Sequence, residues 1–488
     1  MKRLYIGNTT SDTDQRVTKL AEENNTVNYG LITCADDITE DGFYHTTVVD
    51  MASSEIAKIS CTIIKLDQSK ESFSSREEYY QTQELFSNSN NYWQNLVNDN
   101  KSFCIFPFIS HSLNLENTTL CCRSADPVSK TQDFDWHNSL QDIRNKMLQG
   151  TRIANCKTCY KIEDCGSVSP RQSQSIDWAR RLDLDSTKDL NFNKPIMYDI
   201  YPNNKCNLMC RMCSPDYSVL IQREQNDETN YPSSNWDDID LTDAQVVYIA
   251  GGEPTAMQDF QKFLDRCEQE NRLDLEIRVN TNAYKISESL FNKLDKFENI
   301  IFSVSIDGYG SANDYQRWKS KWEDISANIQ RIVNKGHSVN FNIVVSIYTI
   351  FSFYDLVKHL NENYANNFVS IGYPTFENDI LNPFVFKYDD AFLDKITSIS
   401  KMDIYYNSKN LENFVKKLLT NVSSSKLDVE KLTKFFEYND NLDRLRNSKL
   451  QDYIPELEEK RKLLGVKNGQ EKIESNTNKQ RRTLPETQ

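Results

Sequence analysis

Three cysteines stand close together at positions 206, 210 and 213, in the spacing C-x3-C-x2-C. Thiolates gathered in this way suit a soft metal centre better than a disulfide in a reducing compartment. Structural zinc sites and ordinary electron-transfer clusters are closed by four protein ligands. Three thiolates on a 4Fe–4S cube would leave one iron open to a substrate or cofactor, so the spacing predicts a catalytic metal site.

A glycine pair follows the next predicted strand. Residues 246–250 are an apolar run typical of a buried strand, and Gly251, Gly252, Glu253 and Pro254 come directly after it. Glycines let backbone groups approach an amino acid ligand closely, and proline fixes the turn. Together with the cysteine spacing, this GGEP sequence resembles the motif pair of the radical S-adenosylmethionine (SAM) enzymes.

The resemblance implies cofactors and a reaction. Cys206, Cys210 and Cys213 would hold a 4Fe–4S cluster, SAM would chelate its open iron, and the GGEP motif would border the methionine end of SAM. The reduced cluster would cleave SAM to methionine and a 5′-deoxyadenosyl radical, which would abstract a hydrogen atom from an unactivated C–H bond. A reductant such as flavodoxin or ferredoxin would supply the electron. The sequence identifies no general base.

Polar residues at two later strand ends complete the implied SAM site. The resemblance assigns Thr281, Asn282 and Ser305 to the ribose and carboxylate of SAM, with Asp307 as a further candidate. These residue types are also common helix N-caps, so capping of the following helices is the alternative. Met212 stands where many members of the family carry an aromatic residue near the adenine, and methionine can pack there too.

Strand and helix patterns alternate through residues 186–385. Strands are expected at 195–201, 246–250, 275–281, 300–306, 339–347 and 368–373. Intervening stretches such as 258–270 and 285–297 have helical periodicity. This alternation predicts an α/β fold with six parallel strands, and the resemblance implies the partial (β/α)6 TIM-like barrel of radical SAM cores. The cysteines and the GGEP motif then share the edge where parallel strands end.

A second set of cysteines lies in residues 99–185. The set contains Cys104, Cys121, Cys122, Cys156, Cys159 and Cys165. A thiol, a hairpin, a second thiol and a C-x2-C pair make a four-thiolate site possible. A structural zinc knuckle is the alternative.

This second set resembles the twitch domain, a shortened relative of the SPASM domain that carries an auxiliary 4Fe–4S cluster. The implied ligands are Cys104, Cys122, Cys156 and Cys159, with Cys121 as a substitute for its neighbour and no role assigned to Cys165. Glu163, Ser169 and Arg171 resemble a polar tail that follows the C-x2-C pair in such proteins; the alternative is that they are surface residues. Twitch domains commonly follow the barrel, whereas the region that resembles one here precedes the predicted barrel.

The flanking regions carry weaker signals. Residues 1–98 are expected to form a small α/β domain with strands at 3–7, 27–32 and 62–66 and a helix at 13–23. Cys34 and Cys61 are expected to be small core residues. Residues 42–47 combine aromatic, imidazole and hydroxyl side chains and are either a recognition loop or a local packing corner. Residues 313–317 with Trp318 and Trp322 either reach the substrate or form a buried aromatic helix face. Residues 386–466 are expected to be helical and 467–488 a disordered tail.

Composition bounds the partners and the compartment. The formal net charge of −14 disfavours a nucleic-acid binder, and no run of residues is long and apolar enough for a membrane span. The N-terminus lacks the apolar stretch of a signal peptide, which predicts a soluble cytoplasmic protein.

The predicted function is therefore that of a radical SAM enzyme acting on a peptide or protein, or on a sugar-like small molecule. The alternative is a non-catalytic iron–sulfur or zinc protein that serves as an electron carrier or scaffold. That alternative needs a fourth ligand near Cys213, and the neighbouring sequence offers no further cysteine or histidine.

Overall fold

The structure is a computed structural model of the 488-residue chain. It describes residues 88–124, 126–164, 168–365, 367–373, 380–404 and 409–466, together with four short N-terminal strands. The chain divides into two compact units, here called unit 1 (Met1–Ser112 and Asn117–Met197) and unit 2 (Leu113–Glu116 and Tyr198–Gln488).

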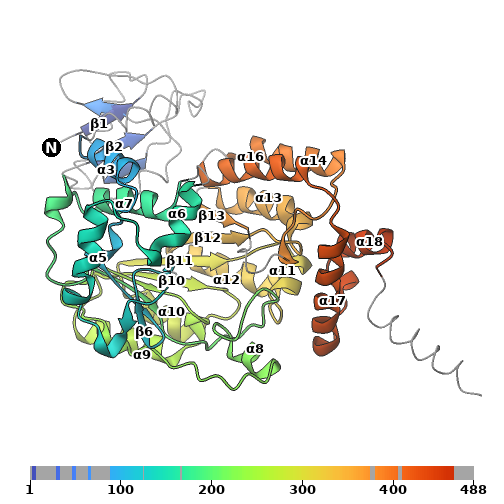
Figure 1. Cartoon of the computed structure of the whole chain (residues 1–488), viewed down its shortest axis with the longest axis horizontal. Coiled ribbons are helices and arrows are strands. Elements are labelled where there is room, and N and C mark those ends of the chain that lie inside the picture. Colours follow the sequence, from blue (N-terminus) through green and yellow to red (C-terminus); the bar gives the residue numbers. More distant parts are fainter. Residues whose placement is uncertain are drawn as a thin grey trace, which may run out of the picture. The chain divides into compact units, whose positions relative to one another are not determined.

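The centre of unit 2 is a run of six strands that lie side by side in sequence order (Figure 1). They are β8 (Met197–Tyr201), β9 (Val246–Ile249), β10 (Glu276–Thr281), β11 (Asn299–Ser305), β12 (Ser338–Val344) and β13 (Phe368–Gly372). Each neighbouring pair from β9 to β13 is parallel. The six strands expected from the sequence are confirmed within a few residues, because their alternating or continuous apolar patterns match one or two buried faces.

Helices follow the strands along the chain. Among them are α8 (Val219–Glu224), α9 (Gln258–Gln269), α10 (Glu288–Leu294), α11 (Ser311–Gln316), α12 (Trp322–Asn334) and α13 (Phe353–Tyr364). The apolar face of α9 buries Phe260, Phe263 and Leu264 in the core. The helix expected at 285–297 begins later, because the hydroxyl of Ser287 accepts a hydrogen bond from the Leu290 N–H (3.2 Å) and caps α10 there.

The C-terminal part of unit 2 is helical, as the sequence predicts. It contains α14 (Asp390–Thr397), α16 (Lys409–Ser424), α17 (Val429–Arg446) and α18 (Pro455–Leu463), drawn in orange and red in Figure 1. Leu432, Phe435 and Phe436 of α17 belong to the same hydrophobic core as the strands. These helices are therefore packed into the fold of unit 2.

Unit 1 contains a four-stranded sheet in the order β3-β2-β1-β4. The strands are β1 (Arg3–Ile6), β2 (Tyr29–Ile32), β3 (Thr47–Asp50) and β4 (Ile64–Leu66), of which β3 was not predicted. The helix expected at 13–23, Cys34, Cys61, Cys165, most of the group at 42–47 and the tail from 467 lie outside the described residues.

The rest of unit 1 supplies the second cysteine set. It contains α3 (Asn88–Asp99), α4 (Phe106–Ile109), β5 (Ser110–Asn114), β6 (Asn117–Thr119), β7 (Ser129–Lys130), α5 (Asn138–Leu148), α6 (Lys157–Asp164) and α7 (Pro170–Arg181). Helices α3 and α7 pack against each other. The domain boundaries expected at residues 98 and 185 stay predictions.

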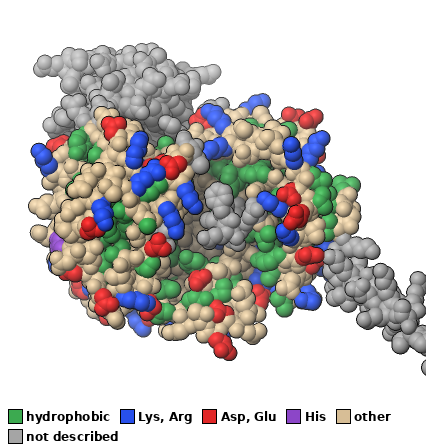
Figure 2. Space-filling model, viewed as in Figure 1, with side chains coloured by type: hydrophobic (Ala, Val, Ile, Leu, Met, Phe, Trp, Pro, Cys, Tyr) green, Lys and Arg blue, Asp and Glu red, His purple; other side chains and the backbone are tan. Residues whose placement is uncertain are grey.

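The described surface mixes charges of both signs. Figure 2 shows lysine and arginine side chains interspersed with aspartate and glutamate on the face in view. Within the part of the chain that the structure describes, no helix combines the length and apolarity needed to cross a membrane.

Candidate metal and cofactor site

The segment from residue 202 to residue 213, here called the cysteine loop, begins where β8 ends and carries the three thiols of the C-x3-C-x2-C sequence. Burial raises the pKa of Cys206 to about 12 and also raises the pKa of Cys210 and of Cys213. The thiols lie near enough to one another that a charge on Cys213 adds to the rise at both other positions. Bare thiolates are therefore disfavoured here, and a bound cation would be needed to hold them deprotonated.

The three thiols are not spaced as the ligands of a single metal ion. Among the described residues, no three Cys, His, Asp or Glu side chains have their donor atoms at metal-binding separations. Whether a cluster suits the place is decided by the chemistry of the groups around the thiols.

Arg317 is the cation next to these thiols. Its guanidinium is buried, pairs with the Asp307 carboxylate at 2.9 Å, and lowers the pKa of Cys206, Cys210 and Cys213 against the effect of burial. The Nε of Arg317 and the Nδ2 of Asn207 are buried and have no acceptor among the described residues. Unpartnered N–H donors and a cation fit an electron-rich group, so the surroundings suit a thiolate-ligated cluster.

The GGEP motif is locked onto the backbone of the cysteine loop. The Gly252 N–H donates to the Asn203 carbonyl at 3.1 Å, and the Glu253 N–H donates to the Lys205 carbonyl at 2.7 Å. A Cβ on Gly252 would lie only 2.2 Å from the Lys205 oxygen. The second glycine is thus required for the approach of the loop that carries Cys206; close approach to a bound amino acid stays a prediction.

Glu253 is the centre of a buried hydrogen-bond network. Its carboxylate accepts from the Thr255 N–H (3.1 Å) and hydroxyl (2.7 Å), the Thr281 hydroxyl (2.7 Å) and the Asn282 N–H (2.7 Å). Burial raises the pKa of Glu253, and the four hydrogen bonds oppose that rise. The negative charge of Glu253 also contributes to the raised pKa of Cys206, which means that motif and loop share one electrostatic environment.

Thr281 and Asn282 are brought to this network by the end of β10. Besides its bond to Glu253, the Thr281 hydroxyl accepts from the Ala283 N–H at 3.0 Å. The Asn282 amide donates to Asn207 of the cysteine loop at 2.8 Å. The capping alternative is wrong for both residues, because Ser287 is the N-cap of α10. Their contact with SAM stays a prediction.

The remaining three candidates differ in burial and in the contacts of their side chains. Ser305 is half-buried, and its hydroxyl has one long hydrogen bond to Asn280 at 3.4 Å. Asp307 is fully buried between the Val344 N–H, Gln316 and Arg317, and it does not cap α11, whose N-cap is Gly310. Met212 is half-buried and packs against the main hydrophobic core.

Residues 316–318, at the end of the segment 313–318, are hydrogen-bonded to the backbone of the cysteine loop. The Arg211 N–H donates to the Gln316 carbonyl at 2.7 Å, and the Met209 N–H donates to the Trp318 carbonyl at 3.0 Å. Tyr315 is fully buried, which confirms the expected buried aromatic face. The segment supports the loop, a role that the sequence did not reveal.

The second cysteine set is partly assembled in unit 1. Burial raises the pKa of Cys104, Cys156 and Cys159, that of Cys156 to about 12; charges on Cys156 and Cys159 add to the rise at Cys104, and a charge on Cys159 adds to the rise at Cys156. Cys122 is exposed, and the half-buried Cys121 accepts from the Arg123 N–H at 3.4 Å. The structure brings three of the four implied ligands together without distinguishing Cys121 from Cys122.

The polar tail after this set is buried. Arg171, which is 2% exposed, makes two hydrogen bonds of 2.8 Å to the Glu163 carboxylate, and the Ser169 hydroxyl donates to the same carboxylate. The surface alternative is therefore wrong. Arg171 also lowers the pKa of the three neighbouring thiols, and its backbone N–H bonds to Cys159. A buried cation thus faces the second set, as Arg317 faces the first.

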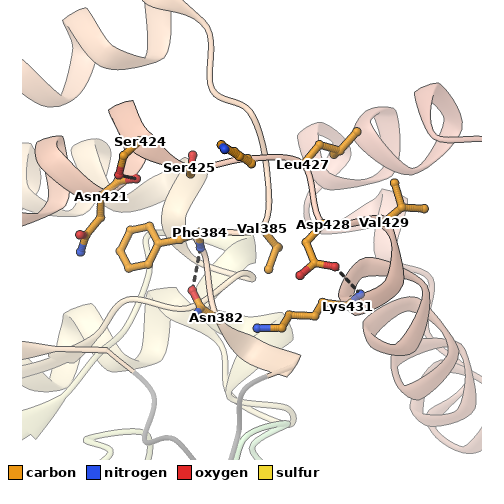
Figure 3. A pocket seen from close by; sticks show the side chains of 11 residues that line it. Asn382, Phe384, Val385, Asn421, Ser424, Ser425, Leu427, Asp428, Val429 and Lys431 are labelled. Atoms are coloured by element: carbon orange, nitrogen blue, oxygen red, sulfur yellow. Dashed lines mark hydrogen bonds between the residues drawn. The ribbon is translucent and has the colours of Figure 1, made fainter.

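A hollow on unit 2 lies away from these residues. It has a volume of about 750 Å³ and lies between residues 382–385 and 421–431, with Phe384, Asp428 and Lys431 among its lining side chains (Figure 3). None of the cysteines or GGEP residues lines it. It is not part of the candidate site.

Comparison with known proteins agrees with this geometry. Residues 200–383 match the family described as the Radical SAM superfamily. Domains of this class belong to enzymes that use a 4Fe–4S cluster and SAM. The matched range contains the cysteine loop, the GGEP motif and the strand ends described above.

No curated protein matches, and the solved structures named below are remote in sequence. Streptococcus suis SuiB bound to S-adenosylmethionine is 18% identical with a TM-score of 0.29 over 59% of this chain and 60% of that one. SuiB bound to the precursor peptide SuiA is 17% identical with a TM-score of 0.29 over 65% and 64%. Tagged anSMEcpe with bound AdoMet is 18% identical with a TM-score of 0.31 over 48% and 61%. The chain covers less than two thirds of each.

Proposed function

We propose that this protein is a radical SAM enzyme whose cluster is held by Cys206, Cys210 and Cys213. The observation that carries the proposal is the convergence of these thiols with the GGEP backbone and the Arg317 cation, inside the segment that matches the radical SAM family. When bound, the cluster and SAM supply reductive cleavage of the sulfonium and hydrogen-atom abstraction from a substrate.

The chain's own residues prepare the site. Gly252 and Glu253 fix the backbone before Cys206 through two hydrogen bonds. Arg317 places a buried cation beside the three thiols, and the Arg317 Nε and the Asn207 Nδ2 are buried donors that a negatively charged group could engage. The residues proposed to bind SAM are Gly251, Gly252, Glu253, Pro254, Met212, Thr281, Asn282 and Ser305.

We propose a second, auxiliary 4Fe–4S cluster on Cys104, Cys156, Cys159 and Cys122, with Cys121 as the substitute ligand. A four-thiolate cluster carries negative charge, and Arg171 supplies a buried cation beside three of these thiols. Metal analysis of a variant that lacks Cys206, Cys210 and Cys213 tests this site. About four residual irons per chain support the auxiliary cluster, whereas one zinc overturns it.

The proposed substrate is a peptide or protein, or a sugar-like small molecule, and the proposed electron donor is a flavodoxin or ferredoxin in the cytoplasm. These assignments follow from the resemblance to twitch and SPASM enzymes. Anaerobic capture of the substrate from the native host would separate the two substrate classes.

The test of the enzyme proposal is 5′-deoxyadenosine formation. Protein reconstituted anaerobically with iron and sulfide, then reduced in the presence of SAM, is expected to release 5′-deoxyadenosine. Cys210→Ala should abolish the product, whereas Cys267→Ala, which removes a buried thiol of α9 outside both sets, should retain it. A fully loaded and reduced sample that forms no product would favour the electron carrier instead.

A further inference from the structure

Arg211 lies between two of the proposed cluster ligands, and its side chain is fully enclosed by protein. The exposed fraction of Arg211 is 1%, and its guanidinium carbon lies 3.6 Å from the centre of the Tyr315 ring. Its Nε donates to the Tyr315 carbonyl at 2.9 Å. An arginine buried to this extent must have a carboxylate partner, because an unpaired cation is costly away from water.

That partner comes from the C-terminal helix α17, 232 residues further along the chain. The Arg211 Nη2 donates to the Asp443 carboxylate at 2.6 Å and to the Ser448 hydroxyl at 2.9 Å, and Nη1 donates to Asn439 at 3.2 Å. Asp443 also accepts from the Tyr315 hydroxyl at 2.8 Å. Every donor nitrogen of the guanidinium is thus engaged, most of them by α17 and the turn after it.

Helix α17 also holds the backbone of the cysteine loop. The Tyr438 hydroxyl donates to the Arg211 carbonyl at 2.6 Å. Arg446 donates to the Met209 carbonyl at 2.9 Å while it pairs with Glu224 of α8 at 2.7 Å. Because the N–H groups of Met209 and Arg211 are bonded to residues 316–318, the peptides on both sides of Cys210 are fixed from two directions.

We propose that α17 is part of the cluster site and that Asp443 and Tyr438 are positioning residues, which hold the cysteine loop so that Cys210 can serve as a ligand. The proposal rests on the proposed function only in naming the group that the loop binds. In this arrangement the C-terminal helices must be folded onto the barrel before the loop can hold its thiols together, and loosening α17 releases Cys210 first.

The metal-free protein offers a direct test. Iodoacetamide alkylation of each cysteine is followed by peptide mass spectrometry in the wild type and in Asp443→Asn, whose side chain has the same shape. Loss of the charge leaves Arg211 without its carboxylate, so alkylation of Cys210 is expected to become at least about tenfold faster as the loop opens locally. Alkylation of Cys267 in the core should not change.

The matched control lies on the same helix. Asp440 makes an equally short pair with Arg461 of α18 (2.6 Å), so its carboxylate joins α17 to α18. Asp440→Asn should therefore leave the Cys210 rate within about twofold of the wild type. Equal acceleration in Asp440→Asn, or unchanged Cys210 reactivity in Asp443→Asn, would overturn the proposal.

A milder variant covers the case in which Asp443→Asn does not fold. Tyr438→Phe removes only the hydroxyl that bonds the Arg211 carbonyl, and a several-fold faster reaction at Cys210 is expected; an unchanged rate refutes the proposal. Iron loading separates this outcome from that of the proposed function. If wild-type protein takes up no iron while Asp443→Asn still exposes Cys210, the cluster assignment fails and the positioning by α17 stands.

Discussion

Replacing Gly252 by alanine places a methyl group against the backbone of the cysteine loop. The new Cβ would lie 2.2 Å from the Lys205 oxygen and 2.5 Å from its carbonyl carbon, where ordinary contacts begin at 3.4 Å. The loop would have to retreat by about 1.2 Å, the difference between 3.4 and 2.2 Å, and the obstacle is backbone that cannot rotate away.

The cost can be worked from the contacts that this retreat disturbs. Overpacking of this kind costs about 1–3 kcal/mol, and the bonds from Gly252 and Glu253 to Asn203 and Lys205 contribute about 0.5–1.5 kcal/mol each. We therefore expect Gly252→Ala to lower the free energy of unfolding by about 2–6 kcal/mol and to move the loop that carries Cys206.

The assay is urea unfolding of the metal-free protein together with iron content after reconstitution. Gly372→Ala is the control, since nothing lies within 4 Å of the added Cβ at the end of β13. A Gly252→Ala protein with wild-type stability and wild-type iron content would refute the claim that this glycine exists to admit the cysteine loop.

Three further predictions use other parts of the described chain. Burial raises the pKa of Asp314 to about 6. Between about pH 4 and 6 the folded state then binds more protons than the unfolded state, so the free energy of unfolding falls as the pH rises through this window. Asp314→Asn should make the free energy of unfolding depend less on pH in this window, as measured by urea unfolding at several pH values. An unchanged pH dependence would contradict the prediction. Arg171→Gln should lower the free energy of unfolding by about 3–5 kcal/mol, because it leaves the Glu163 carboxylate buried without its cation. Arg152→Gln breaks an exposed pair with Asp164 and should have little effect, so equal losses in denaturant unfolding would refute the difference. Metal content at the second set should fall in Arg171→Gln and remain in Arg152→Gln.

The repeating parts of the fold could be predicted from the sequence. The strands from β8 to β13 have period-two or continuous apolar patterns, and α9 has a clear apolar face. The cysteine spacing and the GGEP motif marked the right edge of the sheet because parallel strands end together there. β3 was missed because Thr47–Asp50 offers only a short pattern.

The supports of the site could not be predicted in this way. The pair of Arg211 and Asp443 joins residues 232 apart, and no local period signals such a contact. Polar side chains are mostly exposed, so residue type alone does not predict the burial of Glu163, Ser169 and Arg171. The close approach of the Lys205 carbonyl to Gly252 was not predicted either, because it depends on how the cysteine loop folds back onto the GGEP motif.

The central claim is that three thiolates leave one iron of the cluster open for SAM. Electron paramagnetic resonance of the reduced cluster, recorded with and without SAM in a variant whose second cysteine set has been replaced by serines, tests it most directly. A spectrum that changes when SAM is added is the predicted result, since a new ligand on the open iron alters the cluster's electronic structure. An identical spectrum at saturating SAM, from a sample with about four irons per chain, would contradict the claim.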